Sequence, residues 1–141
     1  MNNKNCIEWF TVGYISKSIA KKAGIPAGVI VISTEGINHI KNGHRREFDK
    51  IGISIIDYVR IVTKNFDAII DNRDGTYKIV KTNKDNPSGT VCVAELRREC
   101  TCNSWKWCVI TSQPQRNPFN PGKAGKKVLW KRKGSSKATL H

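Results

Sequence analysis

Apolar residues in the first half of the chain fall into short runs separated by polar helical segments. Residues 6–16 (CIEWFTVGYIS) are apolar and aromatic enough to predict a strand. Residues 17–24 (KSIAKKAG) predict a short helix, which Gly24 and Pro26 would end. The β-branched run at residues 28–33 (GVIVIS) has the length of a short buried strand. We therefore expect the order strand, helix, strand at the start of the chain.

Two helices are predicted to follow. Ser33 or Thr34 can cap the first helix by accepting a hydrogen bond from an otherwise unpaired backbone N–H. Gly43 should weaken or end that helix. A second, amphipathic helix is expected at about residues 54–65, and its apolar side consists of Ile55, Ile56, Val59 and Val62.

The second half of the chain changes to a strand pattern. Four β-favouring runs between residues 66 and 114 are separated by NRDG, by NKDNPSG and by a turn that carries cysteines. Because short turns join antiparallel neighbours, these runs predict a four-stranded antiparallel meander. Helices followed by a meander indicate an α+β domain, in which N-terminal helices pack on one face of the sheet and the other face stays available.

Length and composition predict a single domain. The chain has 141 residues, which is close to the commonest domain size, and we expect the domain to span residues 1–115. Residues 116–141 form a basic tail rich in Pro, Gly and Lys. The tail is expected to be loosely ordered or to fold against a ligand, apart from a possible last strand at residues 126–132.

Net charge narrows the class of partner. The chain has 25 Lys and Arg residues against 11 Asp and Glu residues, a formal net charge of +14, and no acidic residue follows Arg116. This charge attracts polyanions, so nucleic acid is the expected partner, with an acidic protein or anionic lipid as alternatives. No apolar run could span a bilayer and residues 1–10 lack the pattern of a signal peptide, so the expected site of action is the cytoplasm.

The five cysteines predict neither a disulfide framework nor a metal site. An odd number without a secretory signal argues against paired disulfides. The segment CTCNSWKWC lacks the paired CxxC spacing of zinc ligands, so free thiols are expected. A phosphate-loop signature and an acidic cluster for magnesium are also missing from the sequence, and no cofactor is predicted.

Two of the three histidines, His39 and His44, occur close together among the cations Lys41, Arg45 and Arg46. The unperturbed pKa of imidazole is near neutrality, so two imidazoles beside one phosphate can supply a general base and a general acid. Metal-free RNA cleavage needs this pair, together with a cation that stabilises the charged phosphorane. The alternative is that one or both histidines are ordinary surface residues of a helix.

The spacing of these histidines raises a difficulty. Five residues along an unbroken helix leave the two rings about 140° apart around the helix axis. A break at Gly43, just before His44, would let the chain turn that ring back toward His39.

Lysines and hydroxyls on the predicted strands are further candidates. Alternation puts Lys78 and Lys81 on opposite faces of the sheet, so one lysine at most can face a given side. Thr111 and Ser112 occur where the last strand of the meander ends. Hydroxyls at that position either bind a phosphate or simply terminate the strand.

An acid and a cation share a face of another predicted strand. Glu95 and Arg97 are two residues apart in TVCVAELRRE. Together they could be a base and a phosphate clamp, although most such pairs are solvated surface residues.

Tryptophans in the second half interleave with cations. Aromatic rings stack on bases while cations bind the backbone, so this pattern suits a single-stranded substrate, although Trp107 could equally be a core residue. The residues concerned are Trp105, Trp107, Trp130, Lys106, Lys127, Lys131 and Arg132.

Taken together, residues 28–44 (GVIVISTEGINHIKNGH), a helix, and the runs FDAIIDN, YKIVKTN, TVCVAELRRE and WCVITSQP resemble the phage-encoded branch of the barnase/EndoU/colicin/RelE nuclease superfamily. The similarity spans roughly residues 10–115. It implies a barnase-like fold and metal-independent cleavage of RNA that leaves a 2′,3′-cyclic phosphate. Carried across, the resemblance assigns the catalytic positions to His39, His44, Lys81 (with Lys78 as the second choice) and Thr111 or Ser112.

The sequence thus predicts a small endoribonuclease that acts as a toxin or phage effector. An acidic inhibitor protein, such as an antitoxin or immunity protein, is a natural partner because it can mimic the polyanion. Two alternatives remain: a nucleic-acid-binding protein without catalysis, or a phage protein that blocks a host nuclease or defence complex. The residues expected to bind RNA are Lys41, Arg45, Arg46, Arg97, Trp130, Lys131 and Arg132.

Overall fold

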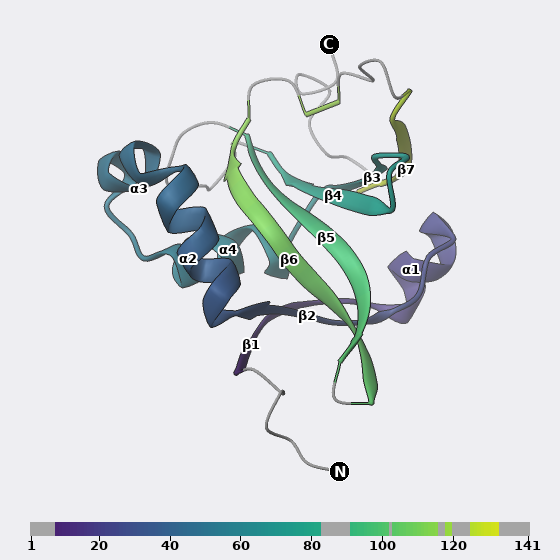
Figure 1. Ribbon diagram of the computed structural model, residues 1–141. Coiled ribbons are helices and arrows are strands. Elements are labelled where there is room, and N and C mark those ends of the chain that lie inside the picture. Colours follow the sequence, from purple (N-terminus) through teal and green to yellow (C-terminus); the bar gives the residue numbers. More distant parts are fainter. Residues whose placement is uncertain (1–7, 83–90, 102, 116–117, 120–124, 133–141) are drawn as a thin grey trace.

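The computed structural model describes residues 8–82, 91–101, 103–115, 118–119 and 125–132. Within these ranges the chain forms seven strands and four helices (Figure 1). The strands are β1 (Trp9–Ile15), β2 (Gly28–Ser33), β3 (Ala68–Asp71), β4 (Thr76–Lys81), β5 (Cys92–Thr101), β6 (Ser104–Pro114) and β7 (Lys127–Lys131). The helices are α1 (Lys17–Ala23), α2 (Thr34–Gly43), α3 (Arg45–Ile51) and α4 (Ile55–Lys64).

All seven strands form one mixed sheet in the order β1-β2-β6-β5-β4-β3-β7. Neighbouring strands are antiparallel except β2 and β6, which run parallel where Ile30 and Val31 pair with Trp107 and Cys108. The prediction of N-terminal helices on a four-stranded antiparallel sheet, and with it the barnase-like fold, is therefore wrong.

The predicted meander is present as β3 to β6, but it forms the centre of the sheet rather than the whole of it. A meander of four strands leaves unpaired backbone N–H and C=O groups along its two outer strands. β2 pairs with the outer edge of β6 and β7 with that of β3, while β1 extends the sheet beside β2. The sequence predicts these three runs as strands, but nothing local in it indicates that they join the sheet.

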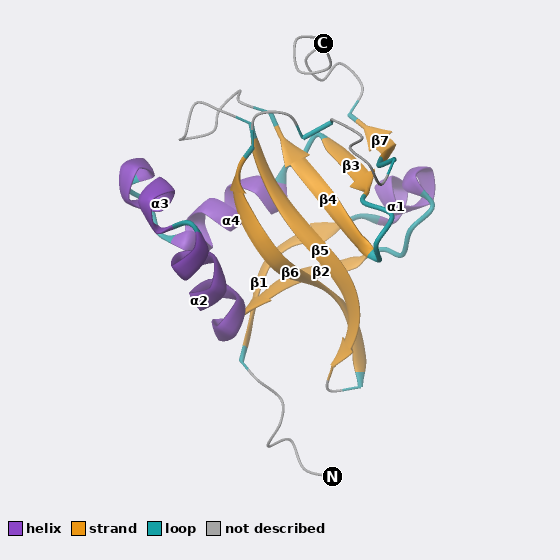
Figure 2. Ribbon diagram, turned by 45° about the horizontal axis from the view of Figure 1, so that its top comes forward, coloured by secondary structure: helices purple, strands orange, loops and turns teal. Residues whose placement is uncertain are grey.

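The helices gather on one face and around the edges of the sheet (Figure 2). α4 buries its apolar side in the main core, against Ile79 of β4 and Leu96 of β5. Alternate side chains of these strands point to the opposite side, where Figure 2 shows no helix in front of β4, β5 and β6. We call this side, which carries Lys78, Glu95 and Thr111, the open face, because no helix covers it in front of β4, β5 and β6. Part of it is covered by the chain itself, where Phe119 packs against the cluster that includes Val80 and Val93.

Serine side chains cap three of the helices. Ser16, Ser33 and Ser54 each accept a hydrogen bond from the backbone N–H three residues further on, which satisfies a donor that the helix cannot pair. Ser33 is thus the cap of α2, as one of the two predicted alternatives. None of the helices in the described ranges is long and apolar enough to cross a membrane.

The cysteines that the structure describes lie on β5 and β6. Cys92 and Cys108 are buried, and Cys100 is exposed. Burial raises the pKa of the Cys108 thiol to about 11, so this thiol stays protonated at neutral pH. The expected free thiols are confirmed for Cys100 and Cys108, and Cys6 and Cys102 lie outside the described residues.

Candidate active site

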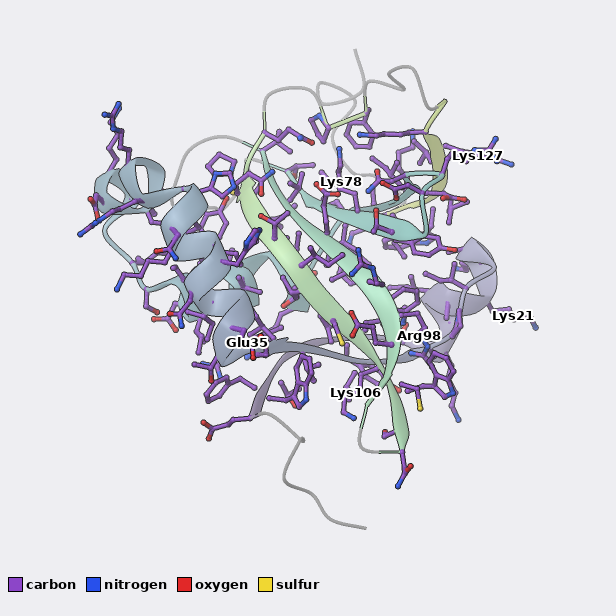
Figure 3. The ribbon with its side chains drawn as sticks, in the orientation of Figure 1. Lys21, Glu35, Lys78, Arg98, Lys106 and Lys127 are labelled. Atoms are coloured by element: carbon purple, nitrogen blue, oxygen red, sulfur yellow. The ribbon has the colours of Figure 1, made fainter. Side chains whose placement is uncertain are left out.

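Three chemically active side chains lie in one row on the open face. Lys78 of β4 pairs in register with Glu95 of β5, and Glu95 pairs with Thr111 of β6. Residues directly opposite each other in antiparallel strands point to the same face with Cβ atoms about 5 Å apart. The row therefore brings an ammonium, a carboxylate and a hydroxyl together, and Figure 3 shows Lys78 at the upper part of the sheet.

Lys78 is the cation of this row, and only 1% of its surface is exposed. Its Nζ donates hydrogen bonds to Oε1 of Gln115 at 2.7 Å and to the carbonyl of Pro118 at 3.3 Å. Burial is the main cause that lowers the Lys78 pKa to about 8, and the nearby charge of Lys126 lowers it further. The Glu95 carboxylate acts in the opposite direction. Lys78 thus exchanges its proton much nearer to neutrality than an ordinary lysine does.

Glu95 is half-buried and held in place by its neighbours. Nδ2 of Asn72 donates to Oε1 of Glu95 at 3.0 Å, and the same nitrogen donates to Oγ1 of Thr76 at 3.0 Å. Arg97 follows Glu95 on the same face and is exposed, 3.9 Å from the carboxylate of Glu99. A positioned carboxylate therefore stands between a buried ammonium and an exposed guanidinium, which can balance the charge of a phosphate.

The face of α2 that meets the sheet is marked by Gly36. A Cβ at Gly36 would lie 3.1 Å from Cγ1 of Ile32 and 3.4 Å from the carbonyl of Val109 on β6. With about 100° of turn per residue, Ile40 lies about 40° to one side of Gly36 and His39 about 60° to the other. Ile40 is fully buried in the main core, whereas His39 is exposed. His39 therefore lies on the flank of α2 that faces away from the core.

His44 lies on the opposite flank of α2 from His39. It is half-buried and about 80° from Gly36 on the same side as Ile40. α2 ends at Gly43, as the sequence predicts, but this break does not turn His44 back, because the backbone N–H of His44 still donates to the carbonyl of Ile40 at 2.9 Å in helical register. The two histidines do not converge in the way that the sequence predicts.

Lys81 and Ser112 also point away from the open face. Lys81 is 7% exposed and lines a hollow beside α4 together with Arg60 and Lys64. Ser112 is fully buried, and its Oγ donates to the carbonyl of Val93 at 2.7 Å. The structure therefore separates Lys81 and Ser112 from Thr111, and Lys78 is the lysine that shares a face with Thr111.

The cations of α2 and α3 that the sequence assigns to RNA binding lie on the surface. Lys41, Arg45 and Arg46 are exposed. Lys41 and Arg45 also line a cavity of about 480 Å³ whose apolar wall includes Phe48 and Ile55. Lys41 lies on the side of α2 away from His39, and Arg45 and Arg46 lie on α3. They therefore add to the positive surface and are not part of the row.

The predicted RNA-binding residues of β7 have structural contacts. Trp130 is half-buried and packs edge-on against Phe66, with ring centroids 5.8 Å apart. Arg132 lies 3.4 Å from the Asp67 carboxylate and donates to the carbonyl of Phe66 at 2.8 Å. Lys131 is exposed. Trp130 and Arg132 thus help to attach β7 to the sheet.

Three residues around the row have no counterpart in the sequence analysis: Asn72, Gln115 and Lys126. Each comes from a turn or a strand end, and reaches Lys78 or Glu95 from a distant part of the chain. A polar residue at a strand end is a common feature of turns, so the sequence holds no local signal for these roles.

Comparison of this chain with protein-family models, with curated proteins and with solved structures finds no significant match. Any assignment of function therefore depends on the residues themselves.

Proposed function

We propose that this protein is a metal-independent endoribonuclease whose active site is the row on the open face together with His39. The observation that carries the proposal is the cross-strand register of Lys78, Glu95 and Thr111. His39 is exposed on α2, the helix that packs against β6. The row supplies a base, a hydroxyl and a cation, and His39 supplies an imidazole as the general acid. The proposal keeps His39 and Thr111 from the sequence prediction and replaces Lys81 with Lys78.

The proposed reaction is an attack of the RNA 2′-hydroxyl on the adjacent phosphorus. The Glu95 carboxylate accepts the proton of the 2′-hydroxyl as the 2′ oxygen bonds to phosphorus. The bond from phosphorus to the 5′ oxygen breaks, and the protonated imidazole of His39 donates its proton to that oxygen. The products are a 2′,3′-cyclic phosphate and a 5′-hydroxyl.

The remaining residues of the site stabilise the pentavalent phosphorane. Arg97 is exposed and can contact a non-bridging oxygen directly, while Thr111 can donate its hydroxyl proton to another. Lys78 is buried beside Glu95, so it acts through electrostatics and as a positioning residue.

An acidic inhibitor protein remains part of this proposal. A chain with a net charge of +14 and exposed cations on α2, α3 and β5 presents a surface that an acidic protein complements. Such an inhibitor would cover the open face and exclude RNA from it.

A second candidate is nucleic-acid binding without catalysis. The burial of Lys78 beneath the carbonyl of Pro118 favours it, because an ammonium that is 1% exposed makes little contact with a ligand. This candidate predicts binding of RNA without any cleavage.

Cleavage of labelled RNA in EDTA separates the two candidates. We expect the wild-type protein to yield 2′,3′-cyclic phosphate ends and Glu95→Gln to lose at least about a hundredfold in rate, because the base is removed. Glu99→Gln is the matched control, since Glu99 is a carboxylate on the same strand that pairs with Arg97. Binding without cleavage by the wild-type protein, or equal rates for Glu95→Gln and wild type, would overturn the ribonuclease proposal.

A further inference from the structure

The hairpin of β5 and β6 carries an exposed tryptophan at its far end. The hairpin extends beyond the rest of the sheet (Figure 1). Trp105 lies on β6 next to the turn and is 60% exposed, which is unusual for so large an apolar side chain. Neither the row nor the core accounts for this exposure.

Arg98 holds the ring of Trp105 in place. The guanidinium carbon of Arg98 is 5.9 Å from the centroid of the Trp105 ring and 5.3 Å from that of Trp107. Arg98 is thus shared between two indoles, and cation–π contacts of this kind restrict the rings they involve. Figure 3 shows Arg98 beside β5 at the lower part of the hairpin.

Trp107, the inner aromatic partner of Arg98, is itself held by several contacts. Trp107 is 1% exposed, and its Nε1 donates to the carbonyl of Pro26 at 3.0 Å. The Tyr77 ring contacts Trp107 edge-on at 5.4 Å between centroids. Gly28 leaves room for Arg98, because a Cβ there would lie 3.1 Å from its Nη1. Trp105 is therefore the outer ring of a stack whose inner ring is buried and hydrogen-bonded.

Cations lie on both faces of this hairpin. Arg98 shares a face with Trp105, whereas the register places Lys106 and Arg97 on the other face. An exposed aromatic ring beside cations is the arrangement that binds single-stranded nucleic acid, with bases stacked on the ring and phosphates beside the cations. Trp105 and Thr111 are six residues apart on β6, about 20 Å along an extended strand, and the bulge between them puts their side chains on opposite faces of the sheet.

We propose that Trp105 is a stacking site for one unpaired base of the RNA, some nucleotides away from the bond that is cleaved. This inference rests on the proposed function, because it takes RNA as the ligand. The preorganised ring contributes to binding of single strands without contacting the reacting atoms, so Trp105 determines the affinity for substrate rather than the chemical step.

The test measures binding of short labelled oligonucleotides whose 2′-hydroxyls are methylated, so that cleavage cannot occur. We expect Trp105→Ala to weaken binding of the base-bearing single strand about tenfold, and Trp105→Phe to retain most of the affinity. An abasic strand of the same length should bind all variants equally, because it offers phosphates but no base. Tyr14→Ala is the matched control, since Tyr14 is 50% exposed and also aromatic.

Two results would overturn the inference: equal affinity of Trp105→Ala and wild type for the base-bearing strand, or an equal loss for the abasic strand. Its failure differs from that of the proposed function. If RNA is cleaved but Trp105→Ala binds normally, this inference alone fails. If binding depends on Trp105 but no RNA is cleaved, the nuclease proposal fails and the stacking site remains.

Discussion

At the scale of single residues, Lys78 shows how burial changes the chemistry of a side chain. An ammonium that loses its water is less stable relative to the neutral amine, and this lowers the pKa of Lys78 to about 8. Gln115 and Pro118 each accept one hydrogen bond from the amine, which partly replaces the lost water. The charged form of Lys78 therefore lowers the free energy of unfolding, and the neutral form does not.

Stability should accordingly depend on pH through Lys78. Between pH 8 and pH 10.5 the unfolded chain keeps the Lys78 proton while the folded chain releases it, so the free energy of unfolding rises with pH across this window. The rise is of order 3 kcal/mol if the full pKa difference is expressed. Lys78→Met should remove this rise, as measured by chemical denaturation from pH 7 to pH 10.5.

Wild type must be compared with Lys78→Met because Cys108 changes the stability in the opposite direction as pH rises. Its thiol pKa is raised in the folded state, so its contribution falls as pH increases above the ordinary thiol pKa. Subtracting the Lys78→Met curve from the wild-type curve leaves the Lys78 contribution. Parallel curves for the two proteins would show that the ammonium is not destabilised by folding.

The sequence predicts part of this residue-scale picture. Alternation alone places Lys78 and Lys81 on opposite faces of β4, as the structure confirms. It does not say which face α4 covers, because that depends on apolar contacts between residues far apart in the chain. The resemblance favours Lys81. In the structure, Lys81 lies on the face that α4 covers, so Lys78 is the lysine that lies beside Glu95.

At the scale of elements, β1 and α4 meet at an unusually close approach. A Cβ at Gly13 would lie 2.6 Å from the backbone carbonyl oxygen of Thr63. Oγ1 of Thr63 also donates to the carbonyl of Val12 at 2.6 Å. Only the missing side chain of Gly13 lets the helix reach the strand at this point.

Gly13→Ala should therefore destabilise the fold by about 3 kcal/mol, because the backbone of α4 must shift to accommodate the methyl group. Gly43→Ala is the matched control: no heavy atom lies within 4 Å of the added Cβ, and alanine favours the helix, so stability should rise by up to about 1 kcal/mol. Thermal and urea unfolding measure both changes. A Gly13→Ala protein as stable as wild type would contradict the observed contact.

Element positions follow from local sequence more readily than element pairing does. The predicted helices near residues 17–24 and 54–65 correspond to α1 and α4, and the strand at residues 28–33 to β2. The end of α2 at Gly43 was predicted, whereas α3 was not predicted as a helix, because His44 precedes it without a side-chain cap. The parallel pairing of β2 with β6 joins residues far apart in the chain, which no periodicity indicates.

At the scale of the whole molecule, the candidate site exists because four elements meet. α2 supplies His39, while β4, β5 and β6 supply Lys78, Glu95 and Thr111. Residue types alone identify His39 and Thr111 as candidates, but their association depends on the register of the strands and on the side of α2 that contacts β6. The net charge of +14 indicates a polyanion and does not reveal where the polyanion binds.

We propose that His39, and not His44, belongs to a ribonuclease site on the open face. The direct measurement is the single-turnover rate of RNA cleavage in EDTA for His39→Ala and His44→Gln, each checked for an unchanged melting temperature. We expect a loss of at least about a hundredfold for His39→Ala and a rate within a few-fold of wild type for His44→Gln. A folded His39→Ala protein that cleaves RNA at the wild-type rate, or an equal loss in both variants, would contradict it.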